Sequence, residues 1–360
     1  MTADSAAIRP GEELDLSRLR NYLRGRLDGV EDGIVLEQFP GGHSNLTYLL
    51  KVGKVKTVGK ETAGKEYVLR RPPLGPVAPR AHDMVREYRI LDAISPHFPA
   101  APKVYLACED AEVIGAKFYI MERRHGLVLR REVPPACRGI ADLPRRASQA
   151  FTDCLAQLHS IDIFHHGLDS LGRPEGFLER QVRGWTGRWE RAKTSDLPEM
   201  ERLREWLHER LPRSQTATIV HNDYKLDNMM LDAEDPGRVT AVLDWEMTSV
   251  GDPLIDVGIV MCYWVQADDP EARKEAISAL TTHPGWYTRE ELLTRYEAAT
   301  GYDLSNIAYY EVYGLFKLAV VLQQIYYRFH AGQTQDTRFR EFDKRVKGLA
   351  EAGVLAMERR

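Results

Sequence analysis

The first third of the chain alternates short apolar runs with polar turns, a pattern typical of antiparallel strands. Strand-like runs lie at residues 34–36, 47–50, 67–70 and 118–122. Apolar residues at helical spacing predict helices at residues 14–27 and 82–94. The pattern therefore predicts a small antiparallel sheet with helical packing.

Helical spacing dominates the rest of the chain. It predicts helices at residues 148–161 and 177–193, and a mostly helical stretch over 289–342 with a buried helix at 309–329. Three short strand-like runs interrupt it at residues 217–220, 229–231 and 239–243. The fold class is therefore α+β, and 360 residues are enough for two lobes.

These three runs frame the chain's most distinctive polar residues. His221, Asp223 and Asn228 follow the first run as H-x-D-x4-N, and Asp244 follows the third. Phosphoryl transfer from a nucleotide uses a carboxylate at the attacking hydroxyl, with an amide oxygen and a second carboxylate on the metal. We therefore expect Asp223 to activate the hydroxyl, and Asn228 and Asp244 to bind Mg²⁺.

Simpler roles exist for each of these residues. A lone loop aspartate is more often a turn or cap residue, but the ordered set favours the catalytic interpretation. Lys225 lies two residues after Asp223, where it could stabilise the charge on the transferring phosphoryl group. The alternative interpretation is that Lys225 is an ordinary exposed lysine.

The motifs resemble those of a known superfamily. They are His221-Asn222-Asp223, Asn228, Asp244-Trp245-Glu246, Gly251-Asp252-Pro253 and Asp256. The set is similar to that of the aminoglycoside phosphotransferase and choline kinase superfamily. Two segments, 39–48 and 67–73, resemble more closely the kinase-like domains found ahead of acyl-CoA dehydrogenase domains and their stand-alone bacterial relatives.

This resemblance covers residues 11–342 and implies a bilobal protein-kinase-like fold. It implies a nucleotide-binding lobe at residues 1–122 and a larger, mainly helical lobe at 123–360 that carries catalysis and the acceptor. ATP with Mg²⁺ would lie between the lobes. Asp256 would hydrogen-bond the backbone of the 221–228 loop, and His221 would orient that loop.

The resemblance also implies a set of nucleotide contacts in the first lobe. A glycine-containing loop would cover the phosphates, although a plain hairpin turn is the simpler interpretation. Arg70 stands where many kinases have lysine, with Glu87 as its expected partner. Backbone groups near Met121 and Arg123 would contact adenine. The loop residues are Gly41, Gly42, His43, Ser44 and Asn45.

An arginine-rich segment at residues 177–193 bears on the acceptor. On a helix, four arginines share one side, and Trp185 and Trp189 lie on the other. The simpler interpretation is an amphipathic helix with a solvated basic face. The alternative is an anion-recognising helix, which would repel polycationic aminoglycosides and favour a neutral or anionic hydroxyl compound, including a hydroxyacyl-CoA. The arginines are Arg180, Arg183, Arg188 and Arg191.

Composition narrows the remaining possibilities. A net charge of −4 argues against nucleic-acid binding, and no apolar run is long enough for a membrane helix. Four scattered cysteines and the lack of a signal-peptide pattern predict a cytoplasmic protein with reduced thiols. The alternatives are a nucleotide-binding pseudokinase, hinted at by Arg70, an aminoglycoside-type kinase, and a protein kinase, for which D-F-G and A-P-E segments are lacking.

Overall fold

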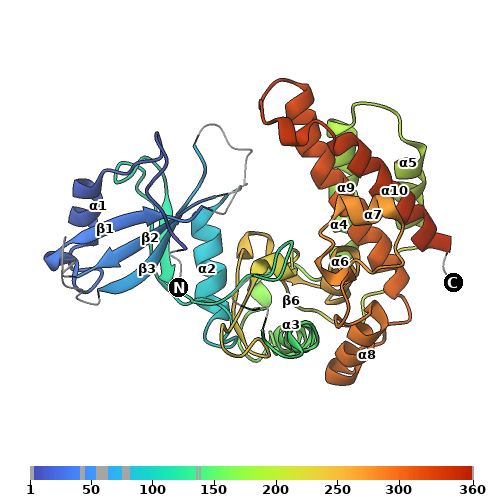
Figure 1. The fold of residues 1–360 in the computed structure, drawn as a ribbon, viewed down its shortest axis with the longest axis horizontal. Coiled ribbons are helices and arrows are strands. Elements are labelled where there is room, and N and C mark those ends of the chain that lie inside the picture. Colours follow the sequence, from blue (N-terminus) through green and yellow to red (C-terminus); the bar gives the residue numbers. More distant parts are fainter. Residues whose placement is uncertain are drawn as a thin grey trace. The chain divides into compact units, whose positions relative to one another are not determined.

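The computed structural model describes residues 4–40, 45–53, 64–74, 82–134, 137 and 139–358. The chain forms two compact units (Figure 1). The first unit is Met1–His125 with Ala241–Glu246, and the second is Gly126–Thr240 with Met247–Arg360. The first unit therefore contains a short segment from late in the sequence, and Asp244 belongs to it. The lobe boundary at residue 122 stays a prediction.

The first unit is built on a five-stranded antiparallel sheet with the order β1-β2-β3-β5-β4. Consecutive residues are buried along β2 and β3, so both faces of the sheet are covered there. The strands are β1 (Ile34–Gln38), β2 (Leu46–Val52), β3 (Lys65–Arg71), β4 (Val104–Cys108) and β5 (Phe118–Glu122).

Two helices pack on this sheet. Leu19 and Leu23 of α1 (Leu16–Leu23) join the core around Tyr48 and Leu69. On β3, Arg70 lies one residue after Leu69 and therefore faces the other way, towards α2 (Met84–Ile94). Asp83 caps α2 by accepting the Arg86 N–H, which places Glu87 in the first turn. The observed helix α1 is shorter at both ends than the helix predicted at residues 14–27.

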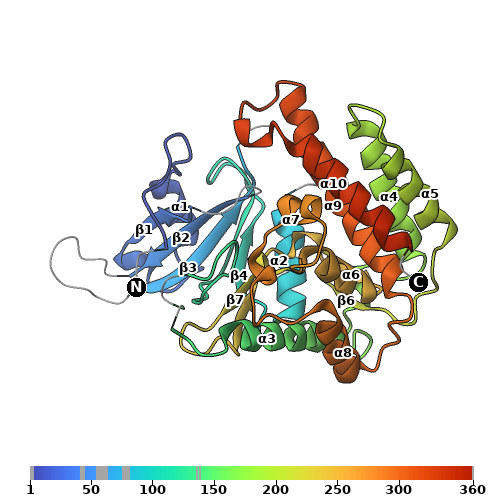
Figure 2. The same ribbon diagram turned by 45° about the vertical axis from the view of Figure 1, so that its right-hand side comes forward.

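The second unit is mainly helical (Figure 2). The long helix α9 packs against α6 and α10. Gly258 of α6 and Gly314 of α9 let the two helices approach closely, because a Cβ on Gly314 would lie 2.6 Å from the Gly258 carbonyl oxygen. The helices are α3 (Leu143–His159), α4 (Phe177–Ala192), α5 (Pro198–Glu209), α6 (Leu254–Tyr263), α7 (Glu271–Ala276), α8 (Arg289–Thr300), α9 (Ile307–His330) and α10 (Phe342–Glu358).

Short strands carry the polar motifs between these helices. β6 (Thr218–Val220) pairs antiparallel with β9 (Ser249–Gly251), and β7 (Met229–Leu231) pairs with β8 (Val239–Val242). The strand-loop-strand pattern predicted around residues 217–243 is therefore present. Among the described residues, no helix is long and apolar enough to span a membrane. The four cysteines are buried free thiols.

Candidate active site

Arg70 is the centre of the polar cluster in the first unit. Its guanidinium lies 3.3 Å from the Glu87 carboxylate and 2.5 Å from Asp244 Oδ1. The structure thus brings together three predicted site residues that are far apart in sequence. Burial raises the pKa of Glu87 to about 7, with Arg70 opposing the rise and Asp244 adding to it. We call Arg70, Glu87 and Asp244 the Arg70 cluster.

Glu246 extends this cluster, and the sequence interpretation gave it no role. Asn45 Nδ2 donates to Glu246 Oε2 at 3.2 Å, and Asn45 Oδ1 lies 2.9 Å from His82 Nδ1. Arg86 donates to the Glu246 carbonyl at 2.6 Å. Burial and then Asp244 raise the pKa of the Glu246 carboxyl. Its signal in the sequence was a second acidic residue two positions after Asp244.

The other predicted nucleotide contacts lie apart from these interactions. Met121 is buried on β5 opposite Val68. Arg123 pairs with Asp4 and lies over the Phe39 ring at 4.7 Å. Their adenine contacts, assigned to the backbone, stay a prediction. The remaining loop residues, Gly41, Gly42, His43 and Ser44, fall outside the described residues.

The second unit positions Asp223, Lys225 and Asn228 in one loop, as the spacing predicted. Lys225 Nζ lies 2.7 Å from Asp223 Oδ2. Asn228 Nδ2 donates to the same carboxylate oxygen at 2.9 Å and to the Asp223 carbonyl at 2.9 Å. Because the Asn228 amide nitrogen is used in this way, its oxygen points elsewhere. This is the orientation a magnesium ligand would need.

Asp256 anchors this loop from α6. Its carboxylate accepts the backbone N–H groups of His221 at 2.6 Å and Asn222 at 2.7 Å, as expected. His159 is buried and bridges Asp256 to Tyr296. Burial alone would raise the pKa of Asp256, but the hydrogen bonds and charges of His159 and His221 hold it below its ordinary value.

Asn222 and Asp244 both adopt left-handed backbone conformations, with φ of 63° and 68°. Asparagine and aspartate tolerate this region better than other residues with a side chain. Such strained positions persist only where surrounding contacts enforce them, and they are common at functional sites. Asn222 adjoins Asp223, and Asp244 is a predicted metal ligand, so both sequence motifs coincide with local backbone strain.

Lys317 of α9 is a further charged residue beside the loop, and the sequence interpretation missed it. It is 6% exposed, and its ammonium donates to the Asn222 carbonyl. Burial lowers its pKa to about 8, opposed by the charges of Asp223 and Asp256. A single lysine in the apolar run of residues 315–321 was the available signal.

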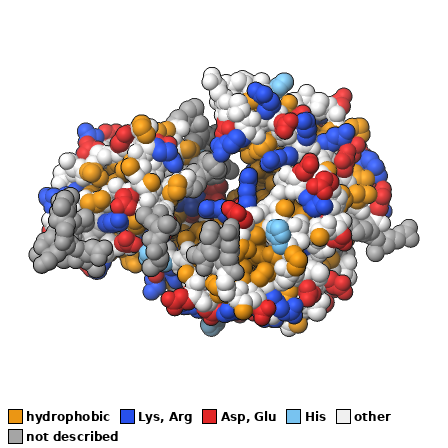
Figure 3. All heavy atoms as spheres, viewed as in Figure 1, with side chains coloured by type: hydrophobic (Ala, Val, Ile, Leu, Met, Phe, Trp, Pro, Cys, Tyr) orange, Lys and Arg blue, Asp and Glu red, His pale blue; other side chains and the backbone are white. Residues whose placement is uncertain are grey.

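The arginine-rich segment is a continuous helix, α4, in spite of its two internal glycines. Trp185 and Trp189 are buried, as the helical spacing predicted. Arg188 differs from the other three arginines because it is half-buried, with its guanidinium 4.5 Å from the Trp185 ring centroid. No carboxylate of a described residue lies within ion-pair distance of it. Figure 3 shows further basic side chains at the surface of the second unit, around α9 and α10.

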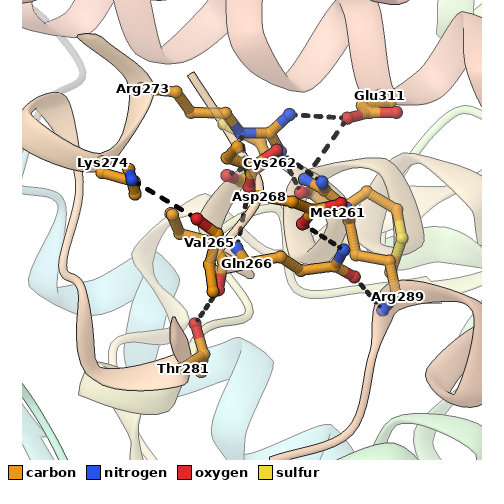
Figure 4. Close-up of polar contacts among 12 residues, drawn as sticks. Met261, Cys262, Val265, Gln266, Asp268, Arg273, Lys274, Thr281, Arg289 and Glu311 are labelled. Atoms are coloured by element: carbon orange, nitrogen blue, oxygen red, sulfur yellow. Dashed lines mark hydrogen bonds and ion pairs between the residues drawn. The ribbon is translucent and has the colours of Figure 1, made fainter. Parts of the chain in front are cut away.

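A buried ionic group supports the C-terminal end of α6 (Figure 4). Arg273 is fully buried and donates to Glu311 of α9 at 2.8 Å and to the Met261 carbonyl at 2.6 Å. Arg289 lies 3.8 Å from the same Glu311 carboxylate. The adjoining Tyr263 has its ring centroid 5.1 Å from Lys225 Nζ. The group thus fixes the helix end that underlies Lys225.

The described residues contain no cluster of three or more histidine, cysteine or acidic side chains suited to a metal. The Mg²⁺ site stays a prediction, and Mg²⁺ keeps several waters and takes few protein ligands. One amide oxygen from Asn228 and one carboxylate from Asp244 are suitable hard ligands. Arg70 occupies one Asp244 oxygen in this structure, so metal binding there would require the guanidinium to shift.

Comparison with known proteins gives a consistent result. A sequence model of the phosphotransferase enzyme family matches residues 35–292. Acyl-CoA dehydrogenase family member 10 of Mus musculus is 34% identical over 92% of this chain and 30% of its own length. Family member 11 of Homo sapiens is 32% identical over 99% of this chain and 45% of its own. The chain therefore spans less than half of either relative.

Solved structures agree in fold. A crystal structure from Ralstonia eutropha, described provisionally as an aminoglycoside phosphotransferase, has a TM-score of 0.78 and 30% identity and covers 96% of this chain and 98% of its own. An aminoglycoside phosphotransferase in complex with AMP-PNP and hygromycin B has a TM-score of 0.57 at 16% identity, with coverage of 95% and 99%. The second likeness concerns the fold alone.

Proposed function

Because this chain belongs to the phosphotransferase enzyme family, we propose that it transfers the γ-phosphoryl group of ATP to a hydroxyl group of a small molecule. The observation that carries the proposal is the 221–228 loop. There a carboxylate, an ammonium and an amide converge within hydrogen-bond distance, and a buried aspartate holds the backbone.

Asp223 is the proposed base. The acceptor oxygen bonds to the γ-phosphorus while the bond from that phosphorus to the β–γ bridging oxygen breaks, and ADP leaves. The hydroxyl proton passes to the Asp223 carboxylate. Lys225 neutralises this carboxylate in the structure and would turn towards the transferring phosphoryl group, where negative charge has to be stabilised.

Asn228 and Asp244 would hold Mg²⁺, which when bound neutralises charge on the nucleotide phosphates. Arg70 would bind a phosphate bidentately, with Glu87 holding the guanidinium in place. The roles of Asn45 and of the loop residues 41–44 rest on the family resemblance.

The acceptor is proposed to be neutral or anionic, with hydroxyacyl-CoA compounds as one class. Arg188 supports an anionic acceptor, because its guanidinium is half-buried and pairs with no carboxylate of the part of the chain that the structure describes, which suits it to binding an anion. The names of the acyl-CoA dehydrogenase relatives support the same class. Arg180 and Arg183 are exposed and carry less weight.

A turnover screen tests both parts of the proposal. Metabolite fractions, hydroxyacyl-CoA compounds and kanamycin are each incubated with the protein, ATP and Mg²⁺, and mass spectrometry detects phosphate gain. Asp223→Asn serves as the matched inactive control. Efficient phosphorylation of kanamycin but not of anionic alcohols would contradict the acceptor class.

A nucleotide-binding pseudokinase is the second candidate, favoured by Arg70 in the lysine position and its contact with Asp244. Thermal stabilisation by ATP with Mg²⁺, without phosphate gain in any fraction, would support it over the enzyme.

A further inference from the structure

Lys317 occupies a position where a charge is costly. It lies in the middle of α9 between the buried residues Phe316 and Leu318, and it is itself 6% exposed. An ammonium group that is removed from water destabilises the fold unless nearby groups compensate it. A methionine or leucine would fill the same space without that cost. The lysine therefore calls for a role other than stability.

Its ammonium donates to the carbonyl of Asn222, the residue before the proposed base. Two further contacts hold Asn222. Its N–H donates to Asp256 at 2.7 Å, and its side-chain amide donates to the Met247 carbonyl at 3.0 Å. With φ at 63°, this backbone would relax if those contacts were lost. Lys317 thus holds one end of the Asn222–Asp223 peptide.

Charged and titratable groups from several packed elements face Lys317. Asp223 and Lys225 come from the loop, and Asp256 and Cys262 come from α6. The Trp185 ring of α4 lies 5.4 Å from the ammonium. The two carboxylates attract Lys317 and Lys225 repels it. The Lys317 ammonium therefore remains a cationic partner of the 221–228 loop in either orientation of Lys225.

We propose that Lys317 is a positioning residue that fixes the Asn222–Asp223 peptide, and so the direction of the Asp223 carboxylate, while Lys225 is released to the transferring phosphoryl group. The two lysines have separate roles, because Lys225 interacts with the Asp223 carboxylate and Lys317 with the Asn222 backbone carbonyl. The effect on catalysis rests on the proposed phosphoryl transfer and is the functional half of this inference. The structural half, that Lys317 fixes the Asn222–Asp223 peptide, does not depend on that function.

Hydrogen exchange tests the structural half without any substrate. In Lys317→Met, backbone amides of residues 219–228 should exchange at least about tenfold faster, because a charge-assisted hydrogen bond is lost. Peptides from α3 and α8 should exchange as in the unaltered protein. Lys347→Met, at an exposed lysine of α10, is the matched control and should change neither region. Unchanged exchange at residues 219–228 in Lys317→Met would overturn the proposal.

Turnover tests the functional half, with hydrolysis of ATP in the presence of Mg²⁺ as the probe until an acceptor is known. Lys317→Met should lower kcat about a hundredfold with little change in KM for ATP, because positioning acts in the transition state. Its melting temperature should be equal or higher, since a buried charge is removed. A lower melting temperature together with a changed KM for ATP would instead indicate a structural role and reject the inference.

The pH profile gives a further check. The kcat of the unaltered protein should fall as pH rises through about 8, where Lys317 loses its proton, and Lys317→Met should lack that decline. A decline that persists in the variant would contradict the assignment. If neither the unaltered protein nor the variant hydrolyses ATP, hydrogen exchange alone decides the positioning contact, and the phosphate-gain screen decides the proposed function separately.

Discussion

The two polar groups of this chain differ in their balance of charge. In the first unit, one guanidinium, Arg70, contacts two carboxylates, Glu87 and Asp244. In the second unit, two ammonium groups, Lys225 and Lys317, face two carboxylates, Asp223 and Asp256. Burial and the charge of Asp244 raise the pKa of Glu87, whereas burial lowers the pKa of Lys317 although both carboxylates oppose it. The first group therefore has surplus negative charge and is suited to gaining a cation, whereas the charges of the second group are balanced.

The strongest test of this comparison removes the Asp223 carboxylate from the second group. Asp223→Ala should lower the rate of phosphoryl transfer about 1000-fold, because general bases contribute roughly 100- to 10,000-fold. Binding of ATP, measured by calorimetry, should remain nearly intact. A variant with normal turnover would remove Asp223 as the base.

Removing the half-buried Asp244 carboxylate of the first group should act on metal binding instead. Asp244→Ala should weaken binding of ATP with Mg²⁺ about a hundredfold, since one metal ligand is lost. Binding of ATP measured with EDTA should change much less, because Arg70 is then free for the phosphates. Equal losses with and without Mg²⁺ would show that Asp244 acts through Arg70 and not through the metal.

Lys317 predicts a pH dependence of stability. Its pKa is about 8 in the folded chain and about 10.5 when unfolded, so between these values the unfolded chain binds more protons. The free energy of unfolding should therefore rise with pH across that window, by about 1–3 kcal/mol relative to Lys317→Met. Urea titrations of both proteins at pH 7.5 and pH 10 measure the difference. A constant difference would show that the lysine keeps its proton.

The smallest expected effect concerns Arg188. Arg188→Gln should raise KM for an anionic acceptor about tenfold with little change in kcat, because a charged contact in the ground state is lost. Arg183→Gln, at an exposed arginine of the same helix, is the matched control and should leave KM within about twofold. Similar effects of the two variants would favour a diffuse basic face over a specific contact.

Sequence spacing predicted the parts of the site that are local in the chain. Asp223 and Asn228 lie five residues apart between two short strands, so the period of the pattern was enough to place them together. This placement depends on strand periodicity and on turn chemistry. The role of Asp256 was predicted from the family resemblance instead.

Long-range partners could not be predicted in the same way. The contact between Arg70 and Asp244 joins residues 174 positions apart, and strand alternation says only which face Arg70 occupies. Lys317 was read as part of a buried helix, although no pattern within α9 indicates which backbone carbonyl its ammonium reaches. Such contacts follow from how helices pack, which one sequence does not reveal.

The close crossing of α6 and α9 at Gly258 and Gly314 has a consequence for how acceptor preference could diversify. The helices that carry Asp256 and Lys317 meet backbone to backbone, so larger side chains at the crossing would separate both anchors of the loop at once. Helix α4, in contrast, packs against α9, with the Trp185 ring 5.4 Å from Lys317 Nζ. New acceptor ranges should therefore arise through exchanges on α4 around Arg188, while the crossing tolerates few substitutions.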